Sequence, residues 1–104
     1  MFRLDNKTAI ITGGGSGIGK AITAVFAGQG AQVYVLDMDE KGGADTVKEI
    51  SANGGKAAFF KCNVAVQEDV KRIVAEIGQR QGSVDILVNN AGIFAPKPFL
   101  DVQE

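Results

Sequence analysis

The sequence contains no histidine and a single cysteine, Cys62. Without histidine, these residues cannot form a Ser-His-Asp triad or the usual zinc sites, and the commonest general base is missing. One cysteine excludes an internal disulfide and fits a reducing compartment. Because no histidine is present to activate its thiol, we interpret Cys62 as a small buried residue at a strand end, not as a nucleophile. Any chemistry in this chain must therefore use other residue types, and we expect no metal site.

Long apolar runs and an excess of either charge are also missing. No apolar stretch approaches the ~20 residues of a membrane helix, and residues 1–7 lack the apolar core of a signal peptide. The net charge is −1, and the basic residues are scattered without interleaved aromatics, which gives no sign of binding to nucleic acid or to an anionic membrane. We expect a cytoplasmic protein, and 104 residues suffice for one domain with a modest core.

What the sequence does have is glycine, concentrated in the stretch AIITGGGSGIGK at residues 9–20. The first residues of this stretch read as the end of a buried strand, and from Gly17 onward the apolar residues follow a helical period. Between them, consecutive glycines remove side chains where the chain turns sharply. A strand, a glycine loop and a helix in this order direct free backbone N–H groups and the positive end of the helix dipole into one volume. Such a volume suits a phosphate or a pyrophosphate.

The dinucleotide fingerprint G-x-G-x-x-G is not met literally in this stretch, but its roles can be filled. Gly13 would form the turn, Gly17 would let the backbone approach a pyrophosphate, and Gly19 would let the helix pack closely on the strand. A glycine-rich turn without a ligand is the plain structural alternative.

The nucleotide P-loop, G-x-x-x-x-G-K-[ST], is a competing interpretation. Gly14, Gly19 and Lys20 match it, but Ala21 stands where the magnesium-binding hydroxyl should be. We therefore favour the dinucleotide interpretation and expect Lys20 to be a solvated helix residue.

Strand and helix patterns alternate along the chain. Apolar runs predict strands at 7–12, 32–37, 56–62 and 84–89, and helical periodicity predicts helices at 17–28, 40–53 and 68–81, with the start of another at 99–104. This alternation predicts an α/β fold with a doubly wound parallel sheet in the strand order 3-2-1-4. The ligand crevice then lies at the carboxyl ends of the strands.

Apolar positions predict the face that each helix buries. These positions are Ile18, Ala21, Ile22, Val25 and Phe26 in the first helix, Ala44, Val47, Ile50 and the stem of Lys48 in the second, and Val70, Ile73, Val74 and Ile77 in the third. Gly42 and Gly43 weaken the first turn of the second helix, which either Asp37 or Asp39 can cap.

Polar residues follow the predicted strands. A carboxylate at Asp37 can accept hydrogen bonds from both adenosine ribose hydroxyls of NAD and would repel the 2′-phosphate of NADP; its alternative role is to cap a helix. Neither Ser16 nor Met38 offers that phosphate a cation. Asn63 and Val64 could read the edge of an adenine, or Asn63 could simply form an Asx-turn.

The segment NNAG at residues 89–92 follows the last predicted strand. Its small residues let the backbone approach a ligand closely, and its asparagine side chains can tie strand ends together. A plain loop cross-link is the alternative, and the two roles are compatible.

Three motifs in order, Thr12-Gly-x-x-x-Gly-x-Gly19, Asp37 and Asn89-Asn-Ala-Gly92, resemble the classical short-chain dehydrogenase/reductase family over the whole chain. The general pattern is similar to 3-oxoacyl-(acyl-carrier-protein) reductases and to sugar or polyol dehydrogenases of that family. The resemblance implies a Rossmann fold and a nicotinamide cofactor, with NAD preferred over NADP because of Asp37.

The resemblance also implies positions around the cofactor. Ser16 and Ile18 would lie near the phosphates and the nicotinamide end, and Asn90 and Ala91 along the ribose wall. The candidate cofactor-binding residues are Gly13, Ser16, Gly17, Ile18, Gly19, Asp37, Met38, Asn63, Val64, Asn90, Ala91 and Gly92.

Two departures from the family pattern matter. The family usually has Asp-Val where this chain has Asn63-Val64, although an amide oxygen can still accept from adenine. The catalytic serine and Tyr-x-x-x-Lys of the family fall after the fourth strand and are absent here, since the only tyrosine, Tyr34, has Met38 four residues later. We therefore expect residues 1–104 to be the N-terminal, cofactor-binding part of a single domain, inactive alone, with further strands beyond it.

The expected function of the full-length protein is NAD-dependent hydride transfer to or from a small alcohol or carbonyl substrate. The resemblance implies a homo-oligomer, either a dimer or a tetramer, without a nucleic-acid or membrane partner. A non-catalytic dinucleotide-binding module and a P-loop nucleotidase remain the alternative functions.

Overall fold

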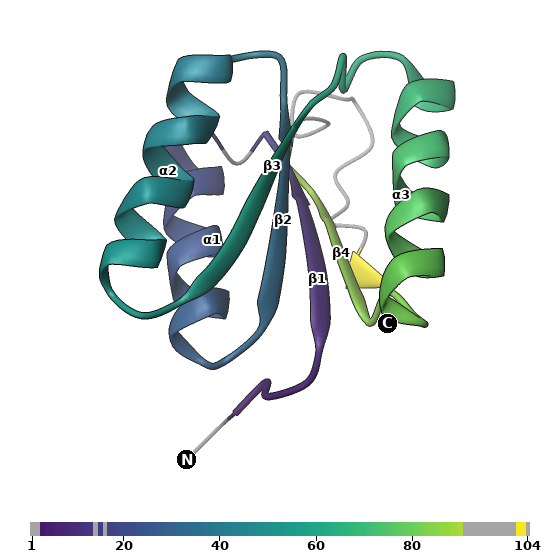
Figure 1. Cartoon of the computed structure of the whole chain (residues 1–104). Helices are drawn as coiled ribbons and strands as arrows, with labels where there is room; N and C mark the ends of the chain where they lie inside the picture. Colours follow the sequence, from purple (N-terminus) through teal and green to yellow (C-terminus); the bar gives the residue numbers. More distant parts are fainter. Residues whose placement is uncertain (1–2, 14, 16, 91–101, 104) are drawn as a thin grey trace.

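The computed structural model describes residues 3–13, 15, 17–90 and 102–103. Within them the elements are, in order, β1 (Thr8–Thr12), α1 (Gly17–Gly28), β2 (Gln32–Asp37), α2 (Glu40–Ala52), β3 (Lys56–Lys61), α3 (Gln67–Gln81), β4 (Ile86–Asn89) and β5 (Val102–Gln103) (Figure 1).

The strands form one sheet in the order β3-β2-β1-β4-β5. β1 pairs in parallel with β2 and β4, and β2 pairs in parallel with β3. The predicted α/β fold with the strand order 3-2-1-4 is therefore confirmed. Because these strands run in the same direction, their carboxyl ends meet at one edge of the sheet.

Helices cover both faces of this sheet, with α1 and α2 on one face and α3 on the other (Figure 1). Ile11 and Val35 belong to the core cluster under α1 and α2, whereas Ile10 and Leu36 belong to the cluster under α3. Successive strand residues point to opposite faces. Both faces are buried, and this is why β1 and β2 read as unbroken apolar runs.

The predicted buried face of α1 is wrong in part. Ile18 and Val25 are 65% and 59% exposed, and Ala21 is exposed as well. Ile22 and Phe26 pack against the core as expected. The residues that face the sheet are small and lie at a four-residue spacing: Gly19, Thr23 and Ala27.

Close packing explains why small residues face the sheet where larger apolar ones were predicted, because a helix lying near the sheet leaves little room between the two. Thr23 is buried at little cost, since its hydroxyl donates to the Gly19 carbonyl at 2.8 Å.

The predicted face of α2 needs the same correction. Ala44 and Lys48 are exposed, and the buried residues are Gly43, Thr46 and Ile50. The Thr46 hydroxyl donates to the Gly42 carbonyl at 2.9 Å. For α3 the prediction is confirmed, with Ile73 and Ile77 buried and Val70 and Val74 packed beside them.

Most element ends agree with the prediction to within two residues. β4 differs most, beginning at Ile86 and not at residue 84. The preceding Asp85 instead ties the start of β1, because its carboxylate accepts from the Thr8 N–H at 2.8 Å and its own N–H donates to the Thr8 carbonyl at 2.9 Å.

The helix start expected at 99–104 is wrong where the structure describes this segment. Val102–Gln103 form β5, antiparallel to β4, with Gln103 opposite Leu87. Pairing satisfies backbone groups that an edge strand would otherwise leave open. Residues 99–101 and 104 lie outside the described residues.

In the described part of the chain, no helix combines the length and apolar character needed to cross a bilayer. Across the same residues, acidic and cysteine side chains form no group of three or more that could hold a metal ion.

Replacing Ile77 by alanine is expected to destabilise the protein by about 2–5 kcal/mol, because this side chain is 0% exposed and links α3 to the sheet. Lys71→Ala, at an exposed position of the same helix, is the matched control and should stay within about 0.5 kcal/mol. Urea unfolding followed by circular dichroism measures both. Equal effects of the two substitutions would contradict the described packing of α3.

Candidate functional site

Glycine and polar residues gather at the carboxyl edge of the sheet. Thr12, the last residue of β1, lies opposite Leu36 of β2 and Asn89 of β4. These strands are neighbours in the sheet. The glycine loop, Asp37 and the asparagine pair therefore lie side by side at their carboxyl ends. This confirms that the fold brings the first, second and fourth strand ends together, as the strand order requires.

The start of α1 packs directly against the end of β1. A Cβ at Gly19 would overlap the Gly13 carbonyl oxygen and would lie 2.8 Å from Asn90 Nδ2. Gly13 has a φ of 70°, and its N–H donates to the Leu36 carbonyl at 2.7 Å. Glycine is therefore required at Gly19 for space and favoured at Gly13 for its backbone angle.

Gly17 opens α1 with a φ of 57°, and among the described residues a Cβ placed there would meet no atom within 4 Å apart from its chain neighbours and its own helix. Gly17 lies in the first turn of α1, where the N–H groups lack intrahelical partners. Ile18, which follows, is 65% exposed. A ligand with negative charge could approach this helix end through the free space.

The two asparagines differ in their contacts. Asn89 Oδ1 accepts from the Thr12 hydroxyl at 3.0 Å, so this side chain ties β4 to β1. Asn90 Nδ2 donates to the Gly13 carbonyl at 3.3 Å, but Asn90 Oδ1 is buried and has no hydrogen-bond partner among the described residues. A buried acceptor without a partner carries a cost that a ligand hydroxyl could remove.

Asp37 does not cap α2. Its Oδ2 accepts from the Gly15 N–H at 2.9 Å, and its Oδ1 accepts from the Asp39 N–H at 3.0 Å. Asp39 is the N-cap, with its carboxylate accepting from the Gly42 N–H at 3.0 Å. The capping alternative is thus assigned to Asp39, and the Asp37 carboxylate is turned toward the glycine loop. Met38, between them, is 51% exposed.

Asn63 forms the local turn that was its alternative interpretation. Its Oδ1 accepts from the Ala65 N–H at 3.1 Å, and the side chain is otherwise at the surface. Val64 packs against the cluster under α3. An adenine contact by this pair stays a prediction. Ser16, Ala91 and Gly92 lie outside the described residues.

Three other polar side chains, those of Lys20, Cys62 and Tyr34, are paired or buried outside the candidate site. Lys20 pairs with Glu49 of α2, Nζ to Oε2 at 2.9 Å, so it is engaged by α2 and not simply solvated as expected. Burial raises the pKa of the Cys62 thiol above its ordinary value, and the nearby Asp69 carboxylate adds to this effect. Tyr34 is buried in the sheet, where its hydroxyl accepts from Gln81 Nε2 at 2.6 Å.

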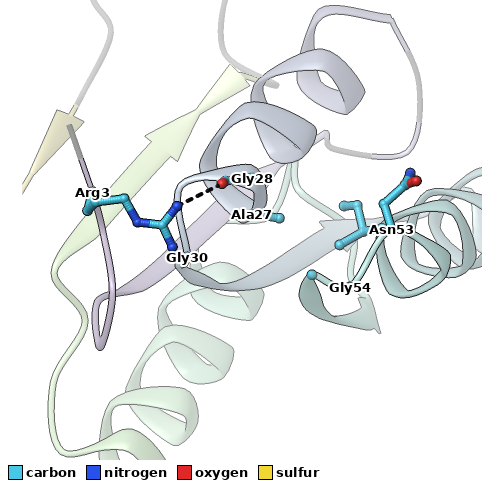
Figure 2. Close-up of a pocket in the computed structure, with 8 residues that line it drawn as sticks. Arg3, Ala27, Gly28, Gly30, Asn53 and Gly54 are labelled. Atoms are coloured by element: carbon cyan, nitrogen blue, oxygen red, sulfur yellow. Dashed lines mark hydrogen bonds between the residues drawn. The ribbon is translucent and has the colours of Figure 1, made fainter. Parts of the chain in front are cut away.

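A cavity of about 220 Å³ lies away from this edge, between the segments that precede β2 and β3. Figure 2 shows Arg3 beside Gly28 and Gly30 on one side of this cavity and Asn53 and Gly54 on the other. These segments lead into the amino ends of the strands, opposite the glycine loop. Arg3 is also paired with Asp5 at 2.9 Å. The cavity is thus separate from the candidate site.

Sequence reasoning did not assign a role to Gly15. Its N–H binds Asp37, and a Cβ at this position would come within 2.7 Å of Asp37 Oδ2. Its carbonyl lies against Gly42 of α2. The available signal was the glycine pair Gly42-Gly43, which is costly in the first turn of a helix and therefore calls for a structural reason.

The arrangement offers backbone N–H groups at a helix start, the Asp37 carboxylate and the amide oxygen of Asn90, which has no partner within the described part of the chain. These groups can bind and orient a ligand that carries a diphosphate and a sugar. Among the described residues at this edge, none pairs a nucleophile with a base.

Comparison with known proteins identifies the family. Residues 7–104 match the family model described as short chain dehydrogenase. Over 98 residues the chain is 44% identical to 7alpha-hydroxysteroid dehydrogenase of Escherichia coli K12, covering 94% of this chain and 38% of that protein. Over 93 residues it is 45% identical to 2,5-dichloro-2,5-cyclohexadiene-1,4-diol dehydrogenase of Sphingobium indicum, covering 89% and 36%.

Solved structures with related sequences share the fold. A 7 alpha-hydroxysteroid dehydrogenase complexed with NADH and 7-oxo glycochenodeoxycholic acid matches with a TM-score of 0.78 at 41% identity, over 85% of this chain and 34% of that chain. The Pseudomonas aeruginosa RhlG/NADP complex matches with a TM-score of 0.75 at 31% identity, over 86% and 36%.

The chain therefore belongs to the short-chain dehydrogenase family, a family of oxidoreductases with a Rossmann-type fold. It spans little more than a third of the length of the curated relatives it matches, 38% and 36% for the two proteins above.

Gly19→Ala tests the contact between α1 and β1. The added methyl group overlaps the Gly13 carbonyl, so we expect a loss of about 1–3 kcal/mol in the free energy of unfolding. Gly28→Ala is the matched control, because it lies in the same helix and its Cβ would have no neighbour within 4 Å. That control should be neutral or stabilising by up to about 1 kcal/mol. Chemical denaturation compares the two variants, and indistinguishable curves would contradict the close contact.

Proposed function

We propose that the full-length protein is an NAD-dependent oxidoreductase that transfers hydride between nicotinamide and an alcohol or carbonyl carbon. Residues 1–104 would form the N-terminal, cofactor-binding part of a single domain. Family membership supports the reaction class, and two of the relatives act, by name, as a hydroxysteroid dehydrogenase and a cyclohexadiene-diol dehydrogenase. One similar structure holds NADH and another NADP, so the family relationship alone leaves the choice of coenzyme open.

The observation that carries the choice of NAD is the position of Asp37. Its carboxylate lies at the end of β2 with Oδ2 2.9 Å from the Gly15 N–H, directly against the glycine loop. An acid in this position accepts hydrogen bonds from ribose hydroxyls and repels a 2′-phosphate. Lys61, opposite Asp37 in the sheet, forms an exposed ion pair with Glu40 at 2.9 Å.

The residues around the loop fit a dinucleotide. Backbone N–H groups at the start of α1 would hold the diphosphate near Gly17, and Asn90 Oδ1, which has no partner among the described residues, would accept from a ribose hydroxyl. Ser16 and Ile18 are proposed near the phosphates and the nicotinamide end. The remaining proposed contacts are Gly13, Gly19, Met38, Asn63, Val64, Ala91 and Gly92.

When bound, the nicotinamide supplies the hydride chemistry. The residues of this chain would bind the coenzyme, orient it and select it. Proton transfer would fall to the tyrosine of the family's Tyr-x-x-x-Lys, assisted by its lysine, and we propose that both, with the catalytic serine, lie in a part of the protein outside residues 1–104. A full-length protein that binds NADH without turnover would instead be a dinucleotide-binding module.

The proposal extends to the setting of the protein. We propose a cytoplasmic homo-oligomer, either a dimer or a tetramer, that acts on a small alcohol or carbonyl compound and has no nucleic-acid or membrane partner. The near-neutral net charge of −1 is consistent with this setting.

Asp37→Ala is expected to weaken NADH binding by roughly 10- to 100-fold, because hydrogen bonds to a charged acceptor are each worth about 1.5–3 kcal/mol. The preference for NADH over NADPH should fall at the same time. Fluorescence titration of the full-length protein with each reduced coenzyme measures both affinities.

Asp45→Ala is the matched control for that titration, since it removes an exposed carboxylate from α2 and tests for a general charge effect. It should leave both affinities unchanged. An Asp37→Ala protein with the wild-type preference would refute the role proposed for this carboxylate.

Lys20→Ala distinguishes the dinucleotide site from a P-loop. Because the ammonium group pairs with Glu49 at a partly exposed position, its removal should change NADH affinity by no more than about fivefold. A P-loop would depend on this lysine and would bind ATP with magnesium. Isothermal titration with NADH and with magnesium-ATP decides, and magnesium-ATP binding that is lost with Lys20 would favour the P-loop.

A further inference from the structure

Gly15 lies between the end of β2 and the first turn of α2. Its N–H donates to Asp37 Oδ2 at 2.9 Å, and the residue is buried. On its other side, the carbonyl oxygen lies 3.5 Å from the Thr46 hydroxyl. A Cβ on Gly42 would come within 2.6 Å of the same oxygen. The backbone N–H and the carbonyl of Gly15 therefore both contact residues of β2 or α2.

The first turn of α2 contains glycine where it contacts Gly15. Glycine costs about 1 kcal/mol relative to alanine in a helix interior, yet Gly42 and Gly43 stand together here. A Cβ on Gly43 would overlap the Phe59 ring, and Thr46 is 1% exposed. The Thr46 hydroxyl gives its proton to the nearer Gly42 carbonyl at 2.9 Å, so it supports Gly15 mainly by packing.

Both oxygens of Asp37 accept from backbone N–H groups, Oδ2 from Gly15 at 2.9 Å and Oδ1 from Asp39 at 3.0 Å. An ionised carboxylate has about four lone-pair sites, so it can hold these N–H groups and still accept from ribose hydroxyls. The same side chain would then contact the coenzyme and the loop that approaches its diphosphate.

We propose that Asp37 is a positioning residue for the glycine loop as well as the selector of the ribose. The carboxylate holds Gly15 against α2, and this contact sets the position of Gly15 before any coenzyme binds. The coenzyme part of this inference rests on the proposed function. Removing the carboxylate therefore weakens diphosphate binding even where the ribose offers nothing to select, and removal of its charge alone does not create a good NADP site.

Amide hydrogen exchange in the full-length protein without coenzyme tests the anchor directly. In Asp37→Ala, exchange at the Gly15 N–H should accelerate by roughly 10-fold or more, the size expected for loss of a hydrogen bond to a charged acceptor. Asp85→Ala is the matched control, because its carboxylate also accepts from a backbone N–H, that of Thr8 at the other end of β1. It should accelerate exchange at Thr8 and leave Gly15 unchanged.

Asp37→Asn keeps the measurement decisive if the alanine variant does not fold. The N–H groups of Gly15 and Asp39 bind different oxygens of Asp37, and the amide keeps only one oxygen, which is uncharged, so we expect exchange to accelerate at one of them at least. Unchanged protection at both positions, or at Gly15 in a folded Asp37→Ala, would overturn the proposal.

A reduced coenzyme built on 2′,3′-dideoxyadenosine tests the consequence for binding, because it lacks the ribose hydroxyls that Asp37 would select. If Asp37 were a selector only, wild type and Asp37→Ala would bind this analogue equally. We expect Asp37→Ala to bind it at least about fivefold more weakly, with Asp37→Asn in between, since the loop has lost part or all of its anchor. Equal affinities, with Gly15 protection unchanged, reject the inference while leaving NADH binding intact. A wild type that binds neither NADH nor the analogue rejects the proposed function instead, and the exchange result then decides the anchor alone.

Discussion

The contact between the end of β1 and the start of α1 leaves no room for a side chain at Gly19. A Cβ there would overlap the Gly13 carbonyl and press on Asn90, which itself donates to that carbonyl. This one approach sets the distance of α1 from the sheet. It places the open helix end beside the carboxyl edge of the strands, and it forces small residues onto the inner face of the helix. The position of the site and the packing of the first βα unit thus have a common cause.

Much of the fold could be predicted from the sequence because the patterns that indicate it are local, and do not depend on how closely the elements pack. Unbroken apolar runs identified strands buried on both faces, and alternation with helices required parallel pairing and the order 3-2-1-4. The faces of α1 and α2 could not be predicted in the same way. Apolar periodicity assumes that the largest apolar side chains face the core, whereas Thr23 and Thr46 are buried because their hydroxyls donate to carbonyls of their own helices. Val25, which the periodicity placed in the core, is 59% exposed.

The short β5 was missed for a related reason. A strand of two residues carries no period, and its pairing with β4 depends on a return of the chain that local pattern does not encode. For the candidate site, sequence placed the glycine loop, Asp37 and the asparagine pair at one edge, and the strand registers bear this out. It did not find Gly15, because a hydrogen bond between a backbone N–H and a carboxylate 22 positions later leaves no local trace.

The roles of the two neighbouring aspartates show why local chemistry alone was ambiguous. Asp37 and Asp39 both follow a strand and precede a helix, so either could cap it. Once Asp39 takes the cap through the Gly42 N–H, α2 no longer needs Asp37, and the Asp37 carboxylate turns toward Gly15. Of the two glycines that weaken α2, Gly42 is then the one that lets Gly15 lie against the helix, whereas Gly43 makes room for the Phe59 ring. Stability given up in the first turn of α2 is thus tied to the geometry of the loop. The proposed choice of coenzyme and the position of Gly15 in the glycine loop would then both depend on the Asp37 side chain.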